Sequence, residues 1–220
     1  MKQLITLSLL MLLALPLAAQ KFYEHDYKNN INLSLFSLVS DNPGFELGYE
    51  RKYGRWSTLA TYTILSDALA RPSFIADTDT TYFKNYGGYR FSFEQRYFLR
   101  KRKVLMPYAG IFTSWLKSEY SRSERFGRGE GYIDTFSVNK ATWVLSPRFG
   151  LQFHFNRLLL DVGTGVGIKW RQVSHTGRED PSDRPSNSLL YIFFPLPRET
   201  VEDKGLTISI PLNVRVAFQF

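Results

Sequence analysis

The sequence predicts an all-β protein, an eight-stranded antiparallel up-and-down transmembrane β-barrel with a polar lumen that side chains fill. The first observation is the segment 205–220, in which apolar and polar residues alternate strictly. Such alternation predicts a strand with one apolar and one polar face. The second is that similar segments recur along the chain, at about 10 residues per crossing, the length that a membrane barrel requires. The third is that, beyond the N-terminal segment, no stretch approaches the ~18 consecutive apolar residues of a transmembrane helix.

The N-terminal segment is predicted to be a secretory signal. Lys2 supplies a positive charge, residues 4–15 an apolar stretch, and the small residues that follow favour cleavage after Ala19. We therefore expect a signal peptide at 1–19, a periplasmic lead at 20–29 and the barrel at 30–220. The absence of cysteine excludes disulfides, lipidation at cysteine and thiol catalysis. The net charge of +8, or +7 without Lys2, suits lipid phosphates in an exported protein, and no nucleic-acid partner is expected.

Eight alternating segments can be placed in order. They are residues 30–39, 45–53, 56–64, 89–99, 107–120, 143–155, 158–171 and 205–220. Glycine at the first central position of Tyr53-Gly54-Arg55-Trp56 predicts a two-residue hairpin, and Asn156-Arg157 predicts another. Together with 100–106, these short connections fall on the periplasmic side, whereas the long connections 66–86, 121–140 and 172–204 fall outside. A soluble lipocalin-like barrel is the alternative, but it would turn its apolar side chains inward around a ligand.

The fifth segment is ambiguous in phase. We expect Tyr108, Phe112 and Leu116 to face lipid, because that arrangement sends Lys117 and Glu119 into the lumen.

Charged residues at the inward positions predict a closed lumen. The predicted polar network consists of Glu46, Glu50, Arg90, Glu94, Arg96, Arg148, Gln152, Asp161, Lys169 and Arg215. Unpaired charges would be prohibitive there, so these residues should form ion pairs. The Asn156-Arg157 hairpin sets Arg148 opposite Gly165, where Gly163, Gly165 and Gly167 should leave space for its guanidinium. Because eight strands enclose an interior that side chains just fill, we expect a plug and no open pore.

Several stretches resemble a known class of protein. These are Phe45-Glu46-Leu47-Gly48-Tyr49-Glu50, Phe93-Glu94-Gln95-Arg96-Tyr97, Pro107-Tyr108-Ala109-Gly110 and the terminal Phe218-Gln219-Phe220. With the alternating strands, they resemble small eight-stranded OmpA/OmpX-type barrels and the "outer membrane protein beta-barrel" families. The resemblance implies an outer-membrane location, contact with lipid and lipopolysaccharide, and an assembly signal at Phe218 and Phe220 that the barrel-assembly machinery reads. It implies little about activity, because such barrels serve many functions.

An enzyme is the rival class. Some barrels of this size resemble lipid A acyltransferases or deacylases, which use histidine and serine at the outer-leaflet level. His25 falls in the periplasmic lead and His154 near the periplasmic end, so His175 is the one catalytic candidate. Asp77-Thr78-Asp79 lacks a full calcium-loop pattern, and neither a metal nor a cofactor is expected.

An apolar run at 189–197 lies inside the last external loop. A ninth spanning strand would break the even strand number, which leaves a loop strand, a cap over the mouth or a partner-binding surface. Tyr191, Ile192, Phe193 and Phe194 are the partner-binding candidates. The favoured function is a non-enzymatic structural or accessory subunit of an outer-membrane complex for assembly, secretion or transport. The lipid A enzyme and a narrow channel are the alternatives.

Overall fold

The computed structural model describes residues 27–35, 37, 44–66, 83–99, 104–126, 132–180 and 202–220. The predicted signal peptide, nearly all of the lead and the apolar run at 189–197 lie outside these residues. The described chain is built from strands: β1 (Asn29–Ser34), β2 (Gly44–Tyr53), β3 (Trp56–Ser66), β4 (Phe83–Phe98), β5 (Leu105–Phe126), β6 (Tyr132–Phe155), β7 (Leu158–Gly165), β8 (Gly167–Thr176), β9 (Asp203–Ser209) and β10 (Leu212–Gln219). Among these residues there is no helix long and apolar enough to cross a membrane.

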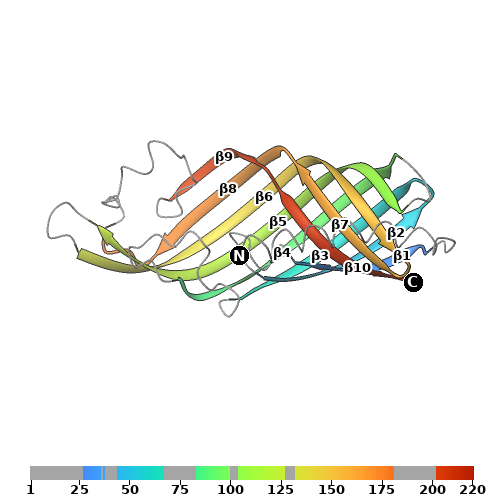
Figure 1. Cartoon of the computed structure of the whole chain (residues 1–220). Coiled ribbons are helices and arrows are strands. Elements are labelled where there is room, and N and C mark those ends of the chain that lie inside the picture. Colours follow the sequence, from blue (N-terminus) through green and yellow to red (C-terminus); the bar gives the residue numbers. More distant parts are fainter. Residues whose placement is uncertain are drawn as a thin grey trace, which may run out of the picture.

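The ten strands form one closed antiparallel barrel (Figure 1). Strand β6 pairs with both β7 and β8, which are successive parts of one long strand, and β9 and β10 are related in the same way. The wall therefore has eight strands, and pairing of β1 with β10 closes it. This confirms the predicted fold class. The two-residue turns at Gly54-Arg55 and Asn156-Arg157 are also confirmed, and Gly54 adopts a φ of 66°, which glycine tolerates best.

The strands are strongly staggered. Partners can be followed across the wall in one row from β1 to β9: Leu33, Leu47, Tyr62, Phe91, Trp115, Trp143, Trp170 and Leu206. Leu33 also pairs with Val216 on β10. Because β9 and β10 are parts of one wall strand, the row meets that strand at two positions ten residues apart, Leu206 and Val216. In an eight-stranded barrel this stagger requires strands tilted by roughly 40° from the axis. The tilt is evident in Figure 1.

Side chains alternate between the lumen and the outer surface along every strand. In β3, for example, Ser57, Leu59 and Thr61 are buried, whereas Trp56, Tyr62 and Ile64 are exposed. The charged residues Glu46, Glu94, Arg148 and Arg215, on β2, β4, β6 and β10, are buried in the lumen, as the alternation predicted for these strands.

The predicted phase of the fifth strand was wrong. Tyr108, Phe112 and Leu116 are buried inside the barrel, and Lys117 and Glu119 are exposed on the outer face. The reason is that aromatic rings inside the lumen stabilise the buried guanidiniums by cation–π contacts. The Arg148 guanidinium lies 3.4 Å from the centroid of the Phe112 ring. Lys117 and Glu119 can face outward because β5 continues well beyond them to Phe126.

Several predicted boundaries also differ. The first strand ends at Ser34 and does not reach residue 39, because Ser37 lies in a turn in which its hydroxyl donates to the Ser34 and Gly44 carbonyls. The segments 121–140, 83–86 and 172–176 were predicted as loops but belong wholly or largely to strands, so the barrel extends further than expected at the end that carries the long connections. The closing segment is two strands, since Pro211 has no N–H for the ladder.

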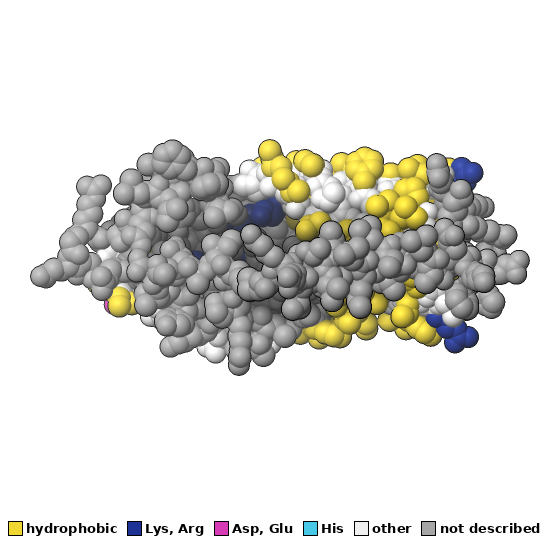
Figure 2. Space-filling view, viewed as in Figure 1, with side chains coloured by type: hydrophobic (Ala, Val, Ile, Leu, Met, Phe, Trp, Pro, Cys, Tyr) yellow, Lys and Arg dark blue, Asp and Glu magenta, His cyan; other side chains and the backbone are white. Residues whose placement is uncertain are grey.

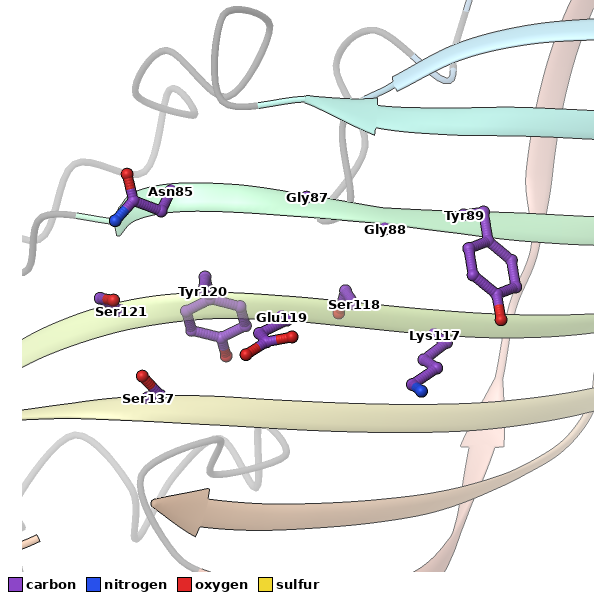
Figure 3. A pocket seen from close by; sticks show the side chains of 10 residues that line it. All are labelled: Asn85, Gly87, Gly88, Tyr89, Lys117, Ser118, Glu119, Tyr120, Ser121 and Ser137. Atoms are coloured by element: carbon purple, nitrogen blue, oxygen red, sulfur yellow. The ribbon is translucent and has the colours of Figure 1, made fainter. Parts of the chain in front are cut away.

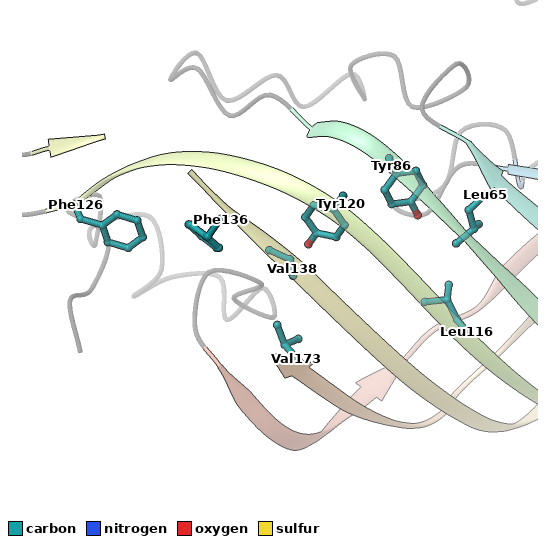
Figure 4. Close-up of a cluster of buried hydrophobic side chains, with 8 residues drawn as sticks. All are labelled: Leu65, Tyr86, Leu116, Tyr120, Phe126, Phe136, Val138 and Val173. Atoms are coloured by element: carbon teal, nitrogen blue, oxygen red, sulfur yellow. The ribbon is translucent and has the colours of Figure 1, made fainter. Parts of the chain in front are cut away.

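This extension of the barrel carries its own apolar cluster (Figure 4). It consists of Leu65, Tyr86, Leu116, Tyr120, Phe126, Phe136, Val138 and Val173, all nearly inaccessible to solvent. This cluster lies beyond the charged part of the lumen and gives the projecting part of the strands a core of its own.

Candidate functional site

The middle of the lumen holds an ion-paired network. Its charged members are four carboxylates and four guanidiniums: Glu46, Glu50, Glu94, Asp161, Arg90, Arg96, Arg148 and Arg215. Their formal charges cancel, and all except Arg90 are nearly inaccessible to solvent. Such pairs offset the cost of burial only when each charge is also well hydrogen-bonded.

Arg96 lies at the centre of this network. Its guanidinium is 3.3 Å from a Glu50 oxygen, 2.9 Å from a Glu94 oxygen and 2.8 Å from an Asp161 oxygen. The three carboxylates come from β2, β4 and β7, so a single side chain links widely separated parts of the wall. Removing it would leave three carboxylates buried with too few partners.

Glu50 is the best hydrogen-bonded carboxylate of the network. Its carboxylate accepts hydrogen bonds from the Ser57 hydroxyl at 2.6 Å, the Asn30 amide at 2.8 Å and the Gln152 amide at 3.3 Å. Toward the end that carries the short turns, the Gln219 amide donates to Asn30 at 3.2 Å and contacts the His154 ring at 3.2 Å.

Tyr108 is a member of the network that the sequence did not reveal. Its hydroxyl donates to Asp161 at 2.9 Å, and its ring lies 4.5 Å from the Arg96 guanidinium. The ring crosses Gly150 and Gly163, where an added Cβ would lie 2.3 Å and 2.7 Å from Tyr108 atoms. The two glycines therefore leave the space that a tyrosine needs inside so narrow a barrel.

Arg148 has the predicted register. Of the three glycines predicted to leave space for its side chain, only Gly165 does so. Arg148 pairs with Gly165, whose added Cβ would lie 2.9 Å from the Arg148 side chain. Gly163 makes room for Tyr108 instead, and Gly167 lies against Ser146. The Arg148 guanidinium contacts Glu94 at 3.2 Å and donates to Asn213 at 3.0 Å.

A cavity of about 380 Å³ lies beside the network, toward the end with the long connections. The basic side chains among its lining residues are Arg90, Lys140, Arg148, Lys169 and Arg215, whereas Glu46 is the single carboxylate among the described residues that line it. The lining also includes the hydroxyls of Ser34, Ser37, Ser92, Ser114, Thr142 and Ser209. Three of these cations, Arg90, Arg148 and Arg215, belong to the ion pairs with Glu46 and Glu94, and Lys140 and Lys169 line the cavity beside them. The predicted lumen residue Lys169 thus lies at this cavity, apart from the ion-paired centre.

A second hollow of about 520 Å³ lies where β4 bulges between Lys84 and Gly87 (Figure 3). Asn85, with a φ of 57°, lies in the bulge that interrupts the pairing with β5, and Lys117 and Glu119 line the opposite side. Among the described residues that line it, one cation and one carboxylate give this hollow no clear charge preference.

The catalytic candidate His175 lies on β8, in the extension of the barrel. Its ring centroid is 4.8 Å from that of Phe136, and its backbone N–H donates to the Glu202 carboxylate. His154 lies inward beside Gln219, near the short-turn end. These contacts hold each ring in place but do not indicate catalysis.

Other predicted sites can be located only in part. The candidates Tyr191, Ile192, Phe193 and Phe194, as well as Asp77 to Asp79, lie outside the described residues. Within the described part of the chain, no group of three or more His, Asp or Glu side chains is arranged to hold a metal ion. Phe218 and Phe220 lie on the outer surface of the closing strand.

Comparison with known proteins gives no family. No family model matches the chain, and no curated protein matches it. Among solved structures, the chain is similar to a major outer membrane protein from Thermus thermophilus, at 11% identity and a TM-score of 0.38. The match covers 89% of this chain and 100% of that one. So distant a match carries no argument about function, which must come from the residues themselves.

Proposed function

We propose that this protein is an outer-membrane β-barrel that crosses the bilayer, has a closed lumen and serves as a structural or accessory subunit. The observation that carries the membrane assignment is the apolar outer surface, where side chains such as Leu47, Phe91 and Phe149 remain about half exposed. Exposed to water, this surface would cost ~25 cal/mol per Å² of apolar area, and a surrounding bilayer removes that cost. Figure 2 shows hydrophobic side chains gathered on the half of the barrel that carries the short turns.

Aromatic residues support the same placement. Trp56 and Tyr97 form a ring pair near the short turns, with centroids 5.0 Å apart. Tyr89 and Trp115, with centroids 5.5 Å apart, lie on the outer surface toward the other end, where Trp143 and Trp170 pair directly across strands. Aromatic side chains favour the two membrane interfaces because their rings combine apolar and polar edges.

The subunit role is supported by the closed lumen and the long external end. Buried ion pairs such as Arg96–Asp161 and Arg148–Glu94 would have to separate before ions could pass through the network, so we expect planar-bilayer recordings to be silent. The extension of β5 and β6 provides a wall on which a partner can dock, and Ile133 there is 65% exposed. The apolar run at 189–197 is the proposed contact segment. Charged substitution of Ile192 and Phe194 should release co-purifying proteins without loss of the folded barrel.

Membrane fractionation combined with gel electrophoresis tests the proposal. The protein should separate with the outer membrane and migrate faster unheated than boiled, because a closed barrel survives detergent. Recovery in the soluble periplasmic fraction would reject the membrane assignment. Steady single-channel openings would instead reject the closed lumen.

A further inference from the structure

Exposed charges of opposite sign lie at opposite ends of the described barrel. The exposed basic residues at the end with the short turns are Lys28, Arg51, Arg55 and Arg157, which we call the basic rim. Every exposed Asp or Glu whose side chain the structure describes lies toward the other end: Glu119, Glu179, Asp180 and Glu202. Figure 2 shows Lys or Arg side chains beyond the hydrophobic groups at the short-turn end. Among the described residues, the surface at that end therefore carries exposed charges of one sign.

The strands and turns fix the level of the basic rim. Arg55 and Arg157 are the second residues of the two tight turns. Arg51 lies two residues before the end of β2. Lys28 precedes β1, and its carbonyl accepts a hydrogen bond from the Lys52 N–H at 2.7 Å. All four residues therefore lie at the edge of the wall, where the apolar outer surface ends.

Tyrosine and tryptophan side chains lie beside the basic rim. The Arg55 guanidinium donates to the Tyr97 hydroxyl at 3.2 Å, and the Tyr97 and Trp56 ring centroids are 5.0 Å apart. The Arg157 Nε donates to the Tyr27 hydroxyl at 3.4 Å. Tyrosine and tryptophan favour the boundary between hydrocarbon and headgroups, so cations beside them lie at the level of the headgroups.

No described carboxylate neutralises the basic rim. Within the described part of the chain, none of its four residues forms an ion pair, and the printed partners of Arg55 and Arg157 are neutral hydroxyls. A tyrosine hydroxyl orients a guanidinium but leaves its charge uncompensated. A phosphate group would compensate the charge, because arginine donates strong hydrogen bonds to phosphate oxygens.

We propose that the basic rim binds the headgroups of anionic phospholipids in the periplasmic leaflet. Arg55 and Arg157 contact the phosphates, and the acyl chains lie against the apolar wall beyond Trp56. This inference rests on the proposed placement in the outer membrane, and it goes further by assigning a lipid class to one end of the barrel. An acidic polypeptide would match the charge of the rim, but it would make no use of the aromatic rings beside it.

Quenching of tryptophan fluorescence by brominated lipids tests the proposal. Trp56 lies at the basic rim and Trp143 lies toward the other end, and both are about half exposed on the outer surface. Two variants each keep one of these tryptophans, with phenylalanine at the other tryptophan positions. In vesicles of equal parts phosphatidylglycerol and phosphatidylcholine, phosphatidylglycerol should associate at least about fivefold more strongly at Trp56, the effect of about one cation near an anionic headgroup. The two lipids should associate about equally at Trp143.

Removal of the cations should remove the preference. With Trp56 as the reporter, Arg51→Gln/Arg55→Gln/Arg157→Gln should lower the preference for phosphatidylglycerol at least about threefold, and added salt should weaken it in the unaltered rim. Lys117→Gln is the matched control, because Lys117 is an exposed cation toward the other end. Residues 100–103 are also basic in the sequence and stay unchanged in every variant, so the difference reports the three arginines.

The outcomes separate this inference from the membrane placement on which it rests. Quenching by both lipids without a preference at Trp56, or an unchanged preference in the triple variant, would overturn the lipid assignment alone. Equal association of the lipids, together with an acidic protein that only the unaltered rim retains, would assign the rim to that protein and also overturn it. Quenching of neither tryptophan by either lipid would reject the placement of the wall in lipid, and the inference with it.

Discussion

The Arg96 guanidinium lies 2.8 Å from an Asp161 oxygen, which ties β4 to β7 across the lumen although these strands do not pair. A small barrel has no room for a thick apolar core, so contacts of this kind support the wall from within. The same contact also blocks the lumen.

Replacing Arg96 by Met should therefore be strongly destabilising. The change leaves Glu50, Glu94 and Asp161 buried with fewer positive partners, and breaking a buried pair costs about 3–5 kcal/mol. Urea unfolding of the refolded barrel, followed by tryptophan fluorescence, measures the loss. Arg55→Met is the control, because Arg55 is exposed and donates to Tyr97 at 3.2 Å. Adding Asp161→Asn to Arg96→Met should recover part of the loss, and a loss below about 1 kcal/mol for Arg96→Met would contradict a supporting role for the network.

Gly150→Ala should destabilise the barrel because its Cβ would meet the Tyr108 ring at 2.3 Å. Overpacking of this kind costs about 1–3 kcal/mol. The same unfolding experiment on Tyr108→Leu and on the double variant should show that the two effects are not additive, since a smaller residue at 108 makes room for the alanine. Additive losses would mean that Tyr108 does not occupy the space above Gly150.

The fold could be predicted from the sequence because lipid and lumen impose opposite polarity on alternate residues. This constraint identified the strand number, the two tight turns and the inward charges such as Glu94 and Arg148. It failed at β5, where apolar residues occur on both faces: Phe112 is needed beneath a guanidinium, and Ile111 faces outward.

The corrected phase of β5 gives a direct test. Ile111 is 61% exposed on the outer face, so Ile111→Arg should destabilise the barrel by about 2–4 kcal/mol if it lies near the bilayer midplane. Glu119→Arg, on the same face but in the external extension, should cost almost nothing. Unfolding titrations of both variants in lipid vesicles make the comparison. Equal stabilities would mean that the two positions share one environment, against the proposed placement.

Phe220 takes part in the pairing that closes the barrel. The Asn29 N–H donates to the Phe220 carbonyl at 3.2 Å, and the Phe220 N–H donates to the Asn29 carbonyl at 2.9 Å. Deleting Phe220 removes both bonds and an outward aromatic side chain, so the heat-modifiable fraction in cells should fall. Phe220→Leu keeps the backbone bonds and separates their contribution from that of the ring. Undiminished assembly after the deletion would show that neither is required.

The central claim is that the wall between the short turns and the external extension lies in lipid. Spin labels at Phe149 and Trp143 on the outer face of β6, and at Ile133 on the extension, test it through their accessibility to oxygen and to a water-soluble nickel complex. In reconstituted vesicles we expect oxygen to reach Phe149 most readily, Trp143 to be intermediate and Ile133 to be readily accessible to the nickel complex. Equal accessibility of Phe149 and Ile133 to the nickel complex would contradict the account, because it would place the entire outer surface in water.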